Sequence, residues 1–194
     1  MRCGEGAARE PMASPLEMHA IPPRDPDSGR VNVIVDTPAG SRNKYRYDSE
    51  LGVYRLSRQL PEGLVFPHDF GSIPCTCAAD GDALDVLVLD ADGTFPGCLV
   101  TVRLVGVLYA RQREGGKAVR NDRLVAVVET SVNRAPLSRL ADLQPERLRA
   151  IEHFFESYNA FQGRQFRISG RGTARRAEHL LDRAITAFRR RKPT

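Results

Sequence analysis

The sequence Asp80-Gly81-Asp82-Ala83-Leu84-Asp85-Val86-Leu87-Val88-Leu89 places three carboxylates at the start of an apolar run. Gly81 permits a tight turn, so the side chains of Asp80 and Asp82 can converge. Asp85 enters the predicted strand, in which alternate residues share a face. Three carboxylates at one strand start repel one another unless a cation neutralises them, and hard oxygen ligands suit Mg²⁺, Mn²⁺ or Ca²⁺. The stretch therefore indicates either a cation site or a solvated Asp-rich turn.

Other short segments of the chain share the strand character of this apolar run. They are rich in β-branched residues and separated by Gly, Pro, Asp or Asn, which is typical of strands. The predicted strands are Val31–Val35, Lys44–Tyr47, Val53–Leu56, Leu84–Leu89, Leu99–Leu108 and Leu124–Val128, with Gln165–Ser169 as a candidate last strand. Their spacing is that of a compact barrel or sandwich and not of βαβ units.

Two helices are predicted towards the end of the chain. Pro145 can occupy a first helical turn, and apolar residues follow it at helical spacing. Thr173 is a suitable N-cap for the final helix, whose apolar stripe recurs at steps of three and four. The apolar positions are Leu148, Ile151, Phe154, Phe155 and Tyr158 in the first helix, and Ala177, Leu180, Leu181, Ala184, Ile185 and Phe188 in the second. The predicted fold class is α+β, a small β-barrel flanked by two main helices.

The first 30 residues differ in texture from the rest of the chain. They contain five prolines, many small or charged residues, and no apolar periodicity. Such a composition cannot offset the entropy lost on ordering. We therefore predict that residues 1–30 form a flexible Pro-rich leader, or an arm docked on a neighbour, and that residues 31–194 form one folded domain.

Composition excludes several classes of protein. The 194 residues are 41% hydrophobic and 27% charged, which suits a globular domain with a core. No stretch approaches the roughly 20 apolar residues needed to span a bilayer, so no membrane partner is expected. The N-terminus lacks the apolar run of a secretory signal, and four cysteines are too few for a disulfide scaffold. A cytoplasmic protein with reduced thiols is predicted.

The net charge of +5 is unevenly distributed. Residues 163–194 contain ten Arg or Lys against two acidic residues, so the remainder of the chain is mildly acidic. A nucleic-acid binder that used the face of the barrel would need exposed aromatic residues, but aromatic residues make up only 7% and Trp is absent. Nucleic acid is therefore not an expected partner.

Further motifs accompany the Asp-rich turn in order. They are Phe66-Pro67-His68-Asp69-Phe70-Gly71, Pro96-Gly97-Cys98, Arg103-Leu104-Val105-Gly106-Val107-Leu108, Leu124-Val125-Ala126-Val127 and Ile151-Glu152-His153-Phe154-Phe155-Glu156-Ser157-Tyr158. Together with the turn they resemble the soluble family I inorganic pyrophosphatases of the bacterial type, from about residue 31 to residue 187. The resemblance implies a five-stranded barrel related to the OB-fold, Mg²⁺-dependent hydrolysis of pyrophosphate with Mn²⁺ as a substitute cation, and a homohexamer.

The resemblance also implies a role for individual residues in two-metal phosphoryl transfer, with the cations roughly 3.5–4 Å apart. Asp80, Asp82 and Asp85 match the family's central acids, as metal ligands, and Asp82 is also the expected proton acceptor for the attacking water. Asp36 stands where the family has Glu and is a further expected metal ligand. The expected phosphate-binding residues are Lys44, Arg58, Arg123 and Tyr158, of which Arg58 and Tyr158 are also expected to be catalytic.

Several positions depart from the family pattern. An acid becomes Arg46, two tyrosines become Phe66 and Phe70, an aspartate becomes Asn121 and a lysine becomes Asn159. Asp122 or Glu114 is positioned in the sequence to compensate for the missing carboxylates. Losing one hydroxyl contact to a charged ligand costs roughly 1.5–3 kcal/mol, so two losses would slow the reaction by roughly 10²–10⁴.

Two function hypotheses remain open from the sequence. The first is a Mg²⁺-dependent pyrophosphatase, either fully active or of reduced rate. The second is a catalytically lapsed homologue that binds a phosphorylated ligand or a protein partner, or that hydrolyses a different phosphoanhydride. In the second hypothesis Arg46 replaces a cation, and Phe66 and Phe70 either belong to the core or stack on an apolar part of the ligand.

Overall fold

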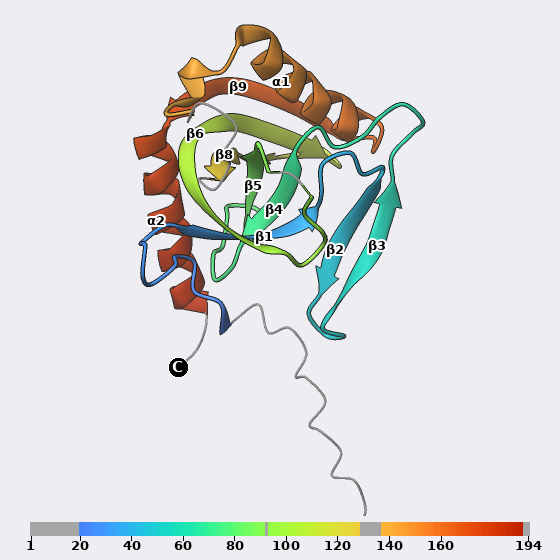
Figure 1. The fold of residues 1–194 in the computed structure, drawn as a ribbon. Coiled ribbons are helices and arrows are strands. Elements are labelled where there is room, and N and C mark those ends of the chain that lie inside the picture. Colours follow the sequence, from blue (N-terminus) through green and yellow to red (C-terminus); the bar gives the residue numbers. More distant parts are fainter. Residues whose placement is uncertain (1–19, 92, 129–136, 192–194) are drawn as a thin grey trace, which may run out of the picture.

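The computed structural model of the chain describes residues 20–91, 93–128 and 137–191 (Figure 1). Most of the strands precede the helices along the chain. The elements are β1 (Val31–Thr37), β2 (Asn43–Asp48), β3 (Val53–Gln59), β4 (Asp69–Ile73), β5 (Leu84–Leu89), β6 (Leu99–Glu114), β7 (Lys117–Arg120), β8 (Arg123–Val128), the short 3-10 helix η2 (Leu140–Asp142), α1 (Pro145–Ala160), β9 (Gln165–Thr173) and α2 (Ala174–Arg191).

Backbone pairing closes five of these strands into a ring. The pairs run from β1 to β4, β5, β8 and β6, and β6 then pairs with β1. The β5–β8 pair is parallel and the other pairs of the ring are antiparallel. β7 and β9 pair with β6, and β2 and β3 form a separate hairpin. The predicted α+β fold with a five-stranded, OB-like arrangement is therefore confirmed.

The two main helices cover different parts of the ring. In Figure 1, α1 lies over β9, α2 runs along one side of the ring, and the β2–β3 hairpin projects on the other side. Alternate side chains of β5 enter two separate hydrophobic clusters, as the strand period requires. Val86 and Val88 pack in the cluster that includes Leu181 of α2, whereas Leu87 and Leu89 pack in the cluster that includes α1.

The structure extends the predicted elements in places. No sequence pattern predicts β4 or β7. All four residues of β7 are exposed, so this strand has no apolar alternation to detect. β6 continues to Glu114 and β9 to Thr173, because these strands pair with each other along their length. α1 begins at Pro145 and α2 follows Thr173 directly, as expected.

Residues just before β1 contact α2. Arg24 Nη2 lies 2.7 Å from Glu178 Oε2 and 3.2 Å from Asp182 Oδ1. The Asn32 side-chain amide donates to the Pro22 carbonyl at 3.1 Å. Residues 1–19 of the predicted leader lie outside the described residues, so the division of the chain at residue 30 stays a prediction.

Two further observations concern the described residues as a whole. No helix among them combines the length and the apolar character required to cross a membrane. The thiols of Cys77 and Cys98 are free.

Candidate functional site

One cleft of about 1130 Å³ is lined by every residue that the sequence analysis names as a site residue. These residues come from elements far apart in the chain: Asp36 from β1, Lys44 from β2, Arg58 from β3, Asp80, Asp82 and Asp85 from the turn and start of β5, Arg123 from β8 and Tyr158 from α1. The fold therefore brings the whole predicted set together. The individual roles of these residues stay predictions.

The Asp-rich turn forms one wall of the cleft. Gly81 has a φ of 96°, a conformation that only glycine adopts readily, and this residue reverses the chain between Asp80 and Asp82. The Asp82 amide donates to Asp80 Oδ1 at 3.3 Å. From α2, Arg191 Nη1 donates to the Gly81 carbonyl at 3.0 Å, so the last helical turn supports this wall.

Asp85 is paired with a buried guanidinium group. Arg123 Nη1 lies 2.5 Å from Asp85 Oδ2, and the Arg123 side chain is only 8% exposed. The guanidinium lies 5.6 Å from the ring centroid of Phe70, 5.8 Å from that of Phe155 and 5.3 Å from that of Phe166. This aromatic surrounding fixes the orientation of Arg123, and Arg123 in turn fixes Asp85.

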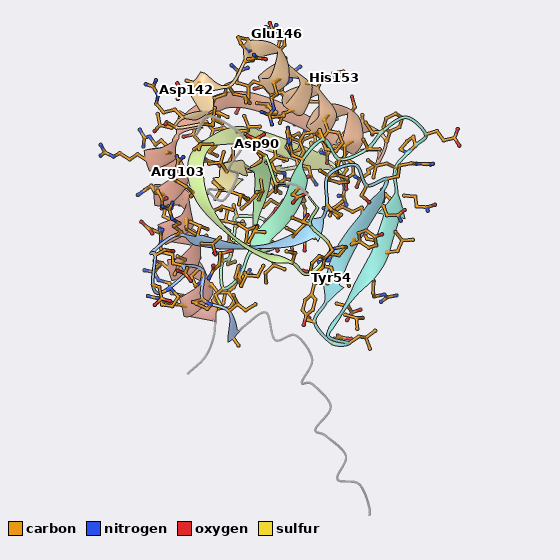
Figure 2. All side chains as sticks on the ribbon, in the orientation of Figure 1. Tyr54, Asp90, Arg103, Asp142, Glu146 and His153 are labelled. Atoms are coloured by element: carbon orange, nitrogen blue, oxygen red, sulfur yellow. The ribbon has the colours of Figure 1, made fainter. Side chains whose placement is uncertain are left out.

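Asp36 is half-buried and close to other charged groups. Burial raises its pKa to about 7, the Asp85 charge adds to that rise, and the Lys44 charge opposes it. The Tyr54 hydroxyl is buried beside this carboxylate, and burial together with Asp36 raises the pKa of Tyr54. Figure 2 shows Tyr54 at the lower part of the β2–β3 hairpin. Asp36 is thus a carboxylate whose charge is incompletely compensated.

Lys44 lies against two aromatic rings. Its Nζ is 4.1 Å from the ring centroid of Phe70 and 5.5 Å from that of Phe66. Burial lowers the pKa of Lys44, while the charges of Asp85 and Asp36 oppose that shift. Phe66 is 1% exposed and Phe70 is 4% exposed, so both belong to the core. Both rings also line the cleft, and their packing against Lys44 holds its ammonium group in place.

The other departures from the family pattern make specific contacts. Arg46 Nη2 lies 3.8 Å from Asp82 Oδ1, and both side chains are exposed. Asn121 lines the cleft, donates from Nδ2 to Gln112 Oε1 at 2.9 Å and accepts a hydrogen bond from Arg123. The Asn159 amide donates to the Phe155 carbonyl at 2.8 Å inside α1.

Asp122 does not compensate for Asn121. Its Oδ1 accepts from the Ala110 amide at 3.0 Å, and its Oδ2 accepts from Arg120 Nε at 2.6 Å. Its side chain is only 8% exposed and does not line the cleft. The bonds to β6 and β7 explain this orientation. The side chain of Glu114 lies outside the described residues.

The carboxylates fit a divalent cation by their chemistry. Partial desolvation raises the pKa of Asp80, and the charges of Asp85 and Asp82 add to the rise, so the acids repel one another in the cleft. A hard cation would relieve this repulsion. Among the described residues, no three Asp, Glu, His or Cys side chains are already grouped as they would be around a metal ion. Asp85 Oδ2 is bound to Arg123, so a cation that used this oxygen would have to displace that contact.

Other residues that line the cleft are not among the predicted set. Lys117, Gln162, Arg164 and Arg191 all contribute to its surface. The basic character of the segments around residues 111–120 and 163–194 was the available signal in the sequence. Charge alone does not locate a residue, because most Lys and Arg side chains are solvated.

Comparison with known proteins gives a consistent result. A family model described as inorganic pyrophosphatase matches residues 33–189. An inorganic pyrophosphatase from Nostoc sp. is 34% identical over 167 residues, which cover 86% of this chain and 96% of that protein. An inorganic pyrophosphatase from Methanosarcina acetivorans is 38% identical over 139 residues, covering 72% of this chain and 80% of that protein.

Solved structures show the same similarity in three dimensions. The crystal structure of inorganic pyrophosphatase from Thermus thermophilus superposes with a TM-score of 0.81 at 31% identity, covering 89% of this chain and 98% of that chain. A structure of an inorganic pyrophosphatase from Neisseria gonorrhoeae superposes with a TM-score of 0.79 at 27% identity, with the same coverage of 89% and 98%.

Proposed function

The chain belongs to the inorganic pyrophosphatase family and is a hydrolase that cleaves pyrophosphate into two phosphates, and we propose that the reaction takes place in the cleft beside Asp80, Asp82 and Asp85. One observation carries this assignment: four carboxylates and the phosphate-binding cations, although distant in sequence, line one cleft. The alternative of a lapsed homologue is not favoured, since the matching family model and the most similar relatives are inorganic pyrophosphatases.

The family is metal-dependent, and the acidic wall of the cleft is the proposed cation site. A bound divalent cation supplies charge neutralisation and lowers the pKa of a water molecule. Asp36, Asp80, Asp82 and Asp85 would hold cations through carboxylate oxygens. Asp82, which is exposed in the cleft, is also the group proposed to accept the proton of the attacking water.

The cationic side chains are proposed to hold the phosphate groups. Lys44 presents a point charge, whereas Arg58 and Arg123 present planar forks that match phosphate oxygens. The Tyr158 hydroxyl adds a neutral donor. Because the rings around Lys44 and Arg123 exclude water, their attraction to phosphate is stronger than at an exposed surface.

We further propose Mg²⁺ as the cation, with Mn²⁺ as a substitute, because the donor set consists of hard carboxylate oxygens. A homohexamer is proposed from the resemblance to bacterial members of the family. A cytoplasmic location is proposed because Cys77 and Cys98 are free thiols, as a reducing compartment would keep them.

The test is phosphate release from pyrophosphate at several Mg²⁺ concentrations, with the variant Asp85→Asn. Loss of this ligand should reduce the Mg²⁺-dependent rate by at least about 10²-fold, the effect typical of losing one transition-state contact. The matched control is Asp142→Asn, an exposed carboxylate outside the cleft that pairs with Arg139. Equal rates for Asp85→Asn and the wild type would contradict the assignment of the reaction to this cleft.

A further inference from the structure

The Asp-rich turn is an exposed segment that is closed by local contacts. Asp80 and Asp82 are both exposed, and Gly81 between them is the residue type with the greatest backbone freedom. The Gly81 amide donates to the Ala78 carbonyl at 3.1 Å, and the Ala78 amide donates to the Asp82 carbonyl at 2.7 Å. Both bonds lie within residues 78–82, so they close the turn but do not fix it against the rest of the molecule.

The second half of α2 contacts this turn at two points. Just before the turn, the Cys77 amide donates to the Ala184 carbonyl at 3.0 Å. In the middle of the turn, Arg191 Nη1 donates to the Gly81 carbonyl at 3.0 Å. Cys77 Sγ lies farther from the same carbonyl oxygen, at 3.8 Å. The helix is therefore bonded to the chain where the turn begins and again between its first two carboxylates.

α2 is itself held by the core. Leu181 and Ala184 are buried in the hydrophobic cluster that contains Val86 and Val88 of β5, the strand into which the turn continues. Because protein interiors are closely packed, a helix and a strand that share one cluster keep a fixed distance. Arg191 therefore extends to the turn from a rigid element.

We propose that Arg191 is a positioning residue of the cation site: by holding the Gly81 carbonyl, it keeps Asp80 and Asp82 in the orientation that binds divalent cations. Groups that orient metal ligands without touching the metal change its affinity by roughly 10–100-fold. Without this bond, the bound cation would itself have to order the turn, and ordering costs affinity. The inference rests on the proposed function, which assigns Asp80 and Asp82 as cation ligands.

The charge of Arg191 and its hydrogen bond predict opposite effects on cation binding. Arg191 lines the cleft, so its positive charge repels a divalent cation, and removing the charge alone would strengthen binding. Removing the hydrogen bond would free the turn and weaken binding. The direction of the change therefore shows which effect dominates, and the proposal requires weaker binding.

The test is calorimetric titration of the full chain with Mg²⁺ in the absence of substrate. Arg191→Met keeps an unbranched side chain but has no donor, and it should raise the Kd for Mg²⁺ about tenfold. Arg191→Lys keeps a donor and should raise the Kd less. The matched control is Arg190→Met, at the neighbouring exposed position of α2 that does not line the cleft, and it should leave the Kd unchanged.

Three results would overturn the proposal. They are a Kd for Arg191→Met equal to or below that of the wild type, an equal rise in Arg190→Met, and a wild type that binds no Mg²⁺. Thermal unfolding in metal-free buffer gives the melting temperature of each variant, and the titrations are made well below it, so that every variant is folded.

Pyrophosphate hydrolysis separates this proposal from the proposed function. If Asp85→Asn abolishes hydrolysis but Arg191→Met binds Mg²⁺ as tightly as the wild type, the positioning role is wrong and the assignment of the reaction to the cleft stands. If Asp85→Asn hydrolyses pyrophosphate at the wild-type rate but Arg191→Met alone loses Mg²⁺ affinity, the positioning role stands and the location of the reaction is wrong.

Discussion

The Asp36 carboxylate has the most strongly perturbed environment of the acids in the cleft. Its pKa is raised from 3.8 to about 7, first by burial and then by the charge of Asp85. Between these two values the folded chain keeps a proton that the unfolded chain has released. The folded state therefore binds more protons in this window, and the contribution of Asp36 to stability falls as the pH rises through it.

Asp36→Asn removes this titrating carboxylate. In metal-free buffer, the free energy of unfolding of Asp36→Asn relative to the wild type should therefore increase from about pH 5 to about pH 8, by up to about 1.4 kcal/mol for each pH unit by which the pKa of Asp36 is raised. The melting temperature relative to the wild type should increase with it. Thermal unfolding at both pH values measures the difference. Asp27→Asn, at an exposed position, is the control and should show no such trend. The same difference for Asp36→Asn at both pH values would contradict the prediction.

The contacts of Asp85 show which features of the site could be predicted from the sequence and which could not. The Asp-rich turn and the cationic candidates are visible in the sequence, and the structure brings them into one cleft. The Asp85–Arg123 pair is not visible, since it depends on the parallel pairing that sets Val86 opposite Leu124. Asp122 illustrates the same limit, because only the register of β6 shows that its carboxylate is bound to the Ala110 amide.

Among the elements, the strands with an apolar or β-branched pattern in the sequence were predictable, and β4 and β7, which lack such a pattern, were not. β5 carries five fully or nearly buried apolar residues, and its apolar run is evident in the sequence. β7 is exposed at every position and exists because the β6 backbone pairs with it. β4 contains Gly71 and Ser72 in place of an apolar run, so its strand character comes from the neighbouring β1 and β5.

Gly71 lies where the backbones of β4 and β1 approach closely. A Cβ atom at this position would lie 2.2 Å from the Ile34 carbonyl oxygen, so β4 could not keep its distance from β1. Gly71→Ala should lower the free energy of unfolding by about 1–3 kcal/mol or more, because overpacking usually costs this much. Denaturant unfolding measures this change.

The control for Gly71→Ala is another strand glycine. At Gly170 of β9 the nearest atom to an added Cβ is Tyr109 Cδ2 at 3.8 Å, which is an ordinary contact. Gly170→Ala should therefore change stability by no more than about 0.5 kcal/mol. If both substitutions destabilise the protein equally, the cost at Gly71 does not come from the close approach of β1 and β4.

In the molecule as a whole, the fold brings basic residues that are far apart in the sequence together in one cleft. Residues 163–194 hold an excess of basic residues, and the helix that ends with Arg191 carries part of that excess to the cleft. The hairpins β2–β3 and β6–β7 add Arg46 and Lys117 from other parts of the chain. A cleft lined by more cations than carboxylates attracts a polyanionic substrate before contact.

The positive electrostatic field of the cleft should make substrate binding sensitive to salt. Because the Debye length falls from about 10 Å at 0.1 M to about 3 Å at 1 M, raising NaCl at fixed free Mg²⁺ should lower kcat/KM several-fold and kcat by less. Arg46→Gln removes an exposed cation of the cleft and should weaken the salt dependence, whereas Arg167→Gln removes one outside it and should not. Steady-state rates over a salt series measure both slopes. Equal slopes for the two variants would mean that the overall charge, and not the charge of the cleft, attracts the substrate.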